Sequence, residues 1–139
     1  MIFRFSTAFI AFFLLPTMSL EAQEVQKWNC LVEDFKGFSD KDQQFIEANM
    51  KKKFTLFVTP TEVSVKTESE RYDDSEERFI FFASDSLARH AIAESVISLE
   101  TISIASDPQR LISERGYFQA TITIQSNILA NSWLLRCFE

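Results

Sequence analysis

Apolar and polar residues alternate most regularly near the end of the chain, over residues 117–138. The first apolar set shares one parity: Phe118, Ala120, Ile122 and Ile124. After Ser126-Asn127 a second set shares one face: Trp133, Leu135 and Cys137. A period of two is typical of a strand with one buried face. The sequence therefore predicts two strands joined by a short turn.

A different pattern marks the beginning of the chain. Residues 8–15 form a compact apolar run that follows Arg4 and is broken by Pro16, and Ala22 is a suitable residue to precede cleavage. This layout is typical of a secretory signal peptide, whereas a membrane anchor needs about 20 apolar residues. We expect residues 1–22 to be a signal peptide and residues 23–139 a single exported domain, periplasmic or extracellular, with no stable membrane anchor after cleavage.

The first strand of that domain is predicted over residues 27–35, where Trp28, Cys30 and Val32 share one face. Cys30 and Cys137 are the two cysteines of the chain. Since an even cysteine count in an exported chain indicates a disulfide, we expect a Cys30–Cys137 bond. This bond would join the first strand to the last and bring their tryptophan-bearing faces to one core.

Further strands are predicted between these two ends. Residues 53–59 and 62–67 alternate on either side of Pro60-Thr61 and indicate a hairpin. Residues 79–82 form a continuous apolar run, which suits a strand covered on both faces or one whose outer face meets the helix or a ligand. A short strand is also expected at Leu111-Ile112, after a turn that begins at Asp107-Pro108.

Residues 95–105 also read as a strand, but their apolar phase changes near Glu100-Thr101. A β-bulge there would return four residues to the core face: Ile97, Leu99, Ile102 and Ile104. The alternative is a strand with two apolar faces.

Helical spacing appears over residues 40–50, with Ser39 as the expected N-cap, while residues 85–94 fit either a helix or an alanine-rich strand. Together these elements predict a mostly antiparallel all-β fold. We expect a small closed or flattened β-barrel or sandwich of about seven strands with one short helix, closed by the disulfide between the first and last strands.

The composition narrows the classes of function. A net charge of −6 argues against nucleic acid and anionic lipid as partners, and the two glycines leave no glycine-rich phosphate loop. Two distant cysteines and one histidine make a weak metal set, so no metal or cofactor is expected. The acidic stretch 68–78 lacks the spacing of a calcium loop and is interpreted as a solvated loop.

Catalytic patterns are also weak. His90 is the one histidine, it lies in the ambiguous segment 85–94, and no Gly-x-Ser-x-Gly motif accompanies it. We therefore expect a non-catalytic domain that binds another protein. A carrier of a small apolar ligand is the alternative, with Phe79, Phe81 and Phe82 as candidate ligand-facing aromatics.

The triplet Trp28-Asn29-Cys30 is similar to the aromatic-x-Cys near the start of small periplasmic lysozyme inhibitors, which are β-barrels with one disulfide. The resemblance covers three residues and implies an enzyme-inhibitor-like protein as a further alternative. The Ser-Gly segment that such inhibitors present to the enzyme is not recognisable in this sequence. The Gly-x-Trp opening of lipocalins is missing as well, and no family is assigned.

Overall fold

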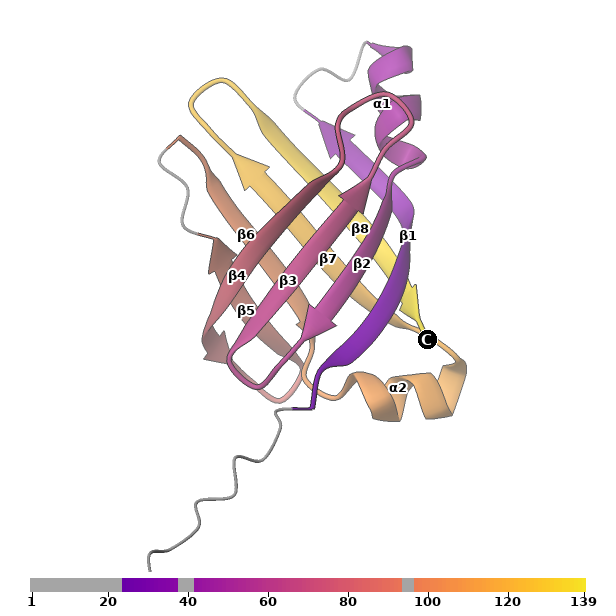
Figure 1. Cartoon of the computed structure of the whole chain (residues 1–139), viewed down its shortest axis with the longest axis vertical. Helices are drawn as coiled ribbons and strands as arrows, with labels where there is room; N and C mark the ends of the chain where they lie inside the picture. The colour runs from indigo at the N-terminus through magenta and orange to yellow at the C-terminus, as the bar shows by residue number, and fades with distance from the viewer. Residues whose placement is uncertain (1–23, 38–41, 94–96) are drawn as a thin grey trace, which may run out of the picture.

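Eight strands form one closed antiparallel barrel in the computed structural model, which describes residues 24–37, 42–93 and 97–139. Each strand pairs with the next along the chain, and the last returns to the first (Figure 1). The strands are β1 (Gln26–Gly37), β2 (Lys53–Val58), β3 (Glu62–Glu68), β4 (Ser75–Ser84), β5 (Ala88–Ala93), β6 (Leu99–Ala105), β7 (Phe118–Gln125) and β8 (Ala130–Phe138). The predicted fold class is confirmed, with eight strands in place of about seven.

The core fills the inside of this barrel because alternate residues of every strand point inward. On β8 the inward residues are Trp133, Leu135 and Cys137, all buried as their spacing predicts. Trp28 packs edge-on against Phe118, with ring centroids 5.3 Å apart. The faces of the terminal strands are therefore confirmed as predicted from the alternation alone.

Closure depends on the pairing of β1 with β8. Cys30 lies directly opposite Cys137 in this ladder, and the two form the predicted disulfide. The register shifts between Val32 and Asp34, which is where a β-bulge bends the first strand. Beyond the bulge, Phe35 pairs with Trp133 and their rings lie 5.2 Å apart.

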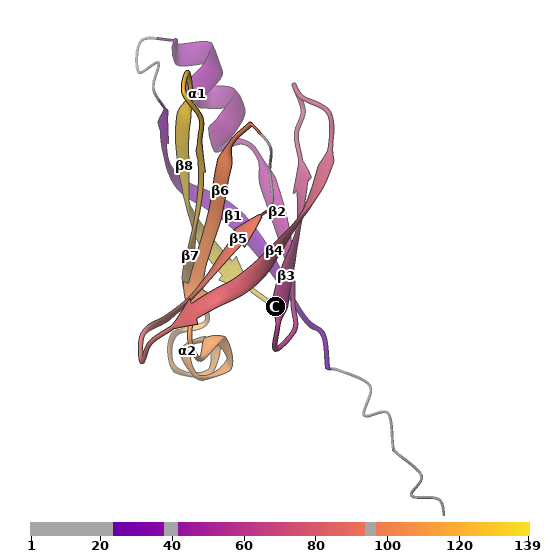
Figure 2. The same cartoon turned by 90° about the vertical axis from the view of Figure 1, so that its left-hand side faces the viewer.

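Two short helices, α1 (Gln43–Met50) and α2 (Pro108–Arg115), lie at opposite ends of the barrel (Figures 1 and 2). The predicted α1 is confirmed, but its N-cap is Asp42, which accepts from the Phe45 amide; the expected cap Ser39 lies outside the described residues. Neither described helix has the length and apolar character needed to cross a membrane.

Helix α2 corrects the turn and short strand predicted over residues 107–112. Asp107 caps the helix by accepting from the Arg110 amide, and Pro108 follows at the first helical position. Gly116 ends it in the left-handed region at φ 80°, which favours glycine. Asp-Pro starts a helix as well as it starts a turn, so the dipeptide did not distinguish the two.

Strand β6 corrects the predicted β-bulge near Glu100-Thr101. The pairing of β6 with both neighbours is continuous there, and Ile97 precedes the strand altogether. Ile97 and Leu99 are exposed, whereas Ile102 and Ile104 fill the core. The apolar phase changes because Ile97 and Leu99 lie at the end of the barrel, whereas Ile102 and Ile104 point into its interior.

The remaining open segments resolve into strands. Residues 88–93 form β5, so the alanine-rich segment is a strand over most of its length. The acidic stretch is a loop only as far as Asp74, because β4 begins at Ser75. Ala91 and Ala93 of β5 face the core of the barrel. Because both side chains are small, this part of the barrel wall can lie close to the side chains opposite.

The disulfide yields the first prediction. Replacing Cys30 and Cys137 together with serine should lower the free energy of unfolding by about 4–5 kcal/mol, because the bond spans 107 residues and restricts the unfolded chain. Urea unfolding measures this loss, and wild-type protein unfolded in a reductant should match the double variant. Equal urea midpoints for the oxidised wild type and the variant would contradict the expected role of the bond.

Candidate functional site

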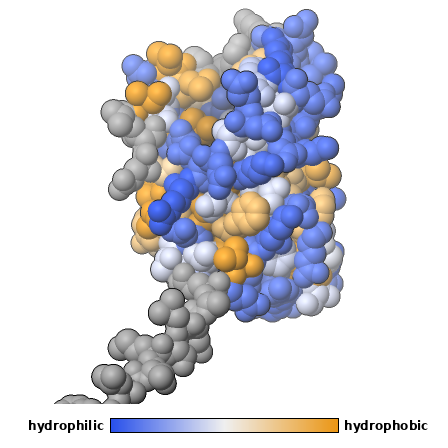
Figure 3. Space-filling model, viewed as in Figure 1, coloured by the Kyte–Doolittle hydropathy of each residue, from blue (hydrophilic) through white to orange (hydrophobic). Residues whose placement is uncertain are grey.

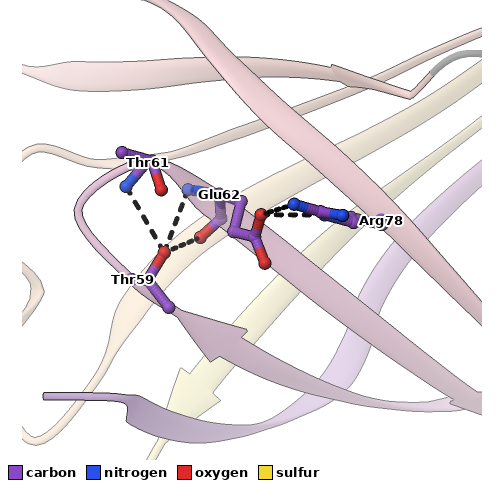
Figure 4. A network of polar contacts seen from close by, with 4 residues as sticks. All are labelled: Thr59, Thr61, Glu62 and Arg78. Atoms are coloured by element: carbon purple, nitrogen blue, oxygen red, sulfur yellow. Dashed lines mark hydrogen bonds and ion pairs between the residues drawn. The ribbon is translucent and has the colours of Figure 1, made fainter. Parts of the chain in front are cut away.

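The two ends of the barrel differ in how they are closed. At the α2 end the Arg89 guanidinium lies 3.6 Å from the Phe81 ring centroid and donates to the Pro60 carbonyl at 2.6 Å. The nearby β2–β3 turn is held by Thr59, whose hydroxyl accepts from the amides of Thr61 and Glu62 (Figure 4). Stacked and hydrogen-bonded groups thus occupy this end, beside a surface pocket of about 500 Å³ that is lined by Glu24, Gln26, Val58, Thr59, Pro60, Arg89 and Ser106.

An ion pair on the outer surface of the barrel supports the same end. The Arg78 guanidinium of β4 donates to the Glu62 carboxylate of β3, with its Nε at 2.8 Å (Figure 4). The outer face of β2, β3 and β4 is mostly hydrophilic in Figure 3, although Ile80 and Phe82 of β4 are exposed.

Apolar side chains gather instead at the opposite, α1 end. Six of the eleven large hydrophobic residues that are exposed in the described chain belong to loops and element ends there, so we call them the mouth rim: Met50, Tyr72, Ile97, Leu99, Ile128 and Leu129. The strand pairings place them at one end of the barrel, because Thr67 pairs with Ser75, Ala93 with Glu100 and Gln125 with Ala130 there. Figures 1 and 2 show these strand ends on the same side of the barrel as α1.

A cavity of about 100 Å³ opens within this end, and we call it the mouth cavity. Its apolar lining comes from five strands: Phe54, Val65, Phe79, Ile122, Ile124 and Trp133. Its polar lining consists of Lys52, Thr67, Ser75, Glu77 and Glu100. Small-molecule sites commonly measure about 300–1,000 Å³, so this cavity suits one chemical group rather than a whole ligand.

Two of the lining carboxylates lie close enough to interact. Glu77 on β4 and Glu100 on β6 belong to the two strands that flank β5. Burial raises the pKa of the Glu77 carboxyl, and the charge of Glu100 raises it further. Glu100 accepts from the Ser98 hydroxyl at 2.7 Å. No described lysine or arginine forms an ion pair with either carboxylate.

Lys52 occupies the other wall of the mouth cavity. Its ammonium lies 4.9 Å from the centroid of Trp133 and 5.2 Å from that of Tyr72, which are cation–π distances. Burial lowers the pKa of this amine. The indole N–H of Trp133 is buried and has no acceptor, an arrangement that costs about 1–3 kcal/mol. On this wall the indole N–H of Trp133 is therefore a polar group without a hydrogen-bond partner in the protein.

The three aromatics expected to face a ligand lie in different places. Phe79 is buried and lines the mouth cavity, Phe81 lies under Arg89 at the α2 end, and Phe82 is 65% exposed on the outside. They do not meet in one site. Sequence reasoning passed over Lys52, Glu77 and Glu100, although Glu77 shares the inward parity of Phe79 and Glu100 that of Ile102.

His90 has polar neighbours on the outer face of the barrel. Its Nδ1 lies 2.8 Å from the Ser103 hydroxyl and its Nε2 lies 3.9 Å from the Asp85 carboxylate. Acyl transfer by such a set also needs donors for an oxyanion. Strands β5 and β6 are each paired on both edges, so their amides are committed to the sheet. We assign no catalytic role to this cluster.

No cluster of three or more metal-binding side chains occurs in the described part of the chain. Comparison with protein-family models, with characterised proteins and with solved structures finds no match for this chain. The arrangement of the α1 end is therefore the basis for any functional proposal.

The carboxylate pair yields a prediction on stability. Replacing Glu77 with glutamine should raise the free energy of unfolding at pH 7 by about 0.5 kcal/mol, because it removes a charge that burial and Glu100 disfavour. A raised folded-state pKa contributes stability below the usual value of 4.5 and loses it as pH rises through the folded pKa. The gain should therefore vanish at low pH and be largest at neutral pH.

Urea unfolding at a series of pH values measures this difference. The matched control is Glu76→Gln, which removes the same charge from the exposed neighbouring position, opposite Lys66. A Glu77→Gln variant that is less stable than wild type at pH 7 would contradict the unfavourable placement of this carboxylate.

Proposed function

We propose that this protein is a non-catalytic exported domain that binds another protein through the α1 end of its barrel. The observation that carries the proposal is the mouth rim, a set of exposed apolar side chains at the end of the barrel that also holds a cavity with charged walls. Water-exposed apolar clusters are costly to keep and mark interaction sites. Most strand edges of the barrel are paired, so its ends are the places where loops can engage a partner.

The volume of the mouth cavity favours a protein over a small apolar ligand. A carrier of lipid-like molecules needs a hollow interior, whereas the inward side chains of this barrel form one continuous core. The mouth cavity, at about 100 Å³, is below the usual range for a small-molecule pocket. The rim residues also lie outside the cavity, where a protein surface can cover them and an enclosed ligand cannot.

The covalent chemistry supports an exported location for this protein. A disulfide persists in an oxidising environment, which fits export from the cytosol. The sequence pattern of residues 1–22 adds the expectation of a signal peptide. The proposed site of action is therefore the periplasm or the outside of the cell, where the partner would be found.

Site-specific photo-crosslinking tests this proposal. A photoreactive amino acid at Ile128, which is 81% exposed on the mouth rim, should crosslink to a partner in the producing cells. The matched control is Leu87, which is also 81% exposed but lies at the opposite end of the barrel. We expect a discrete adduct from position 128 and none from position 87.

The same pair of positions measures the contribution of the rim. Ile128→Ser should weaken binding of the crosslinked partner by about fivefold or more, since a central apolar contact is worth about 1 kcal/mol or more. Leu87→Ser should leave binding unchanged. Equal adducts from both positions, or none from position 128, would refute a partner at the mouth.

A further inference from the structure

We infer that the mouth cavity receives a basic side chain, lysine or arginine, presented by the partner protein. This inference rests on the proposed function and adds the chemistry of the group that enters the barrel. It starts from Glu77 and Glu100, which line the cavity from strands on either side of β5. Their carboxylates sit at one wall of a space large enough for the end of one side chain.

Charge complementarity specifies the occupant. The cavity lining holds two carboxylates against the single ammonium of Lys52, so its formal charge is negative. Lys52 is held on the opposite wall by Trp133 and Tyr72 and forms no ion pair with either acid. An incoming cation would therefore meet two carboxylates that have no cationic partner, in a partly desolvated place where such attraction is stronger than in water.

The apolar lining suits the rest of a basic side chain. Lysine and arginine carry aliphatic stems that pack on apolar surface while their charged ends reach polar groups. Phe54, Phe79 and Trp133 supply aromatic surface beside the carboxylates, and a cation is also attracted to aromatic faces. Lys52 already demonstrates this attraction on the Trp133 ring.

The mouth rim indicates how the partner would present this group. Exposed Ile97, Leu99 and Ile128 supply apolar surface at the same end of the barrel as the cavity. A partner loop with a basic residue between apolar neighbours would bury the rim and place its charge between Glu77 and Glu100. Burying apolar surface would supply affinity, and the buried charge pair would supply specificity.

A probe titration followed by nuclear magnetic resonance tests the inference without knowledge of the partner. The probe is ethylguanidinium, and its neutral isostere ethylurea is the control. The chain has two tryptophans, so the indole N–H signals of ¹⁵N-labelled protein report two places. Trp133 lines the mouth cavity, while Trp28 packs on Phe118 in the core and serves as the internal reference.

We expect ethylguanidinium to shift the Trp133 signal in a saturable manner and to leave the Trp28 signal unchanged. Glu77→Gln and Glu100→Gln should each weaken the apparent Kd about threefold, and the double variant about tenfold. Glu76→Gln should bind as wild type does. These glutamine variants keep side-chain size, and dispersed amide spectra verify that each is folded.

Three results would overturn the inference. They are an equal response to ethylurea, an unchanged Kd in the double variant, or saturable binding of propionate in place of the cation, which would assign recognition to Lys52. The two proposals fail separately. Crosslinking from position 128 without probe binding would refute the basic side chain alone, and probe binding without a crosslinked partner would refute the protein partner and leave only the preference of the cavity for a cation.

Discussion

The pairing of β1 with β8 is the constraint on which the rest of this structure depends. It turns an eight-stranded meander into a closed surface, so every strand has two neighbours and most strand edges are paired within the barrel. The Cys30–Cys137 bond lies within this ladder and makes its register covalent. Closure also gives the barrel an interior, which solvent can reach through its two ends.

The two ends of the barrel are closed differently, because the inward positions hold different types of side chain at each end. At the α2 end Arg89 covers Phe81 and hydrogen-bonds to the Pro60 carbonyl. At the α1 end the inward positions hold Glu77 and Glu100, which repel each other and cannot fill the space between them with apolar contact. An eight-stranded barrel is just wide enough for its side chains to fill, so unfavourable pairs at one end leave a small cavity.

This arrangement separates the groups that stabilise the barrel from those to which we assign binding. The core cluster and the disulfide provide the stability, and the α1 end holds groups that reduce it: partly buried acids, a half-buried amine and an indole N–H without an acceptor. Such unfavourable placements are expected where a surface is kept ready for a partner. The protein-binding role proposed for this end accounts for them together.

Local alternation by itself predicted the fold class and the inward faces of Trp28 and Trp133, because a period of two is visible in neighbouring residues. The disulfide was predicted from the even cysteine count. The local pattern did not distinguish helix α2 from a turn, since Asp107-Pro108 starts either one, and it left β5 undecided. The mouth cavity was decided by tertiary structure alone. Glu77 and Glu100 meet only because two strands pair with β5 in one particular register, and no local pattern encodes that distance.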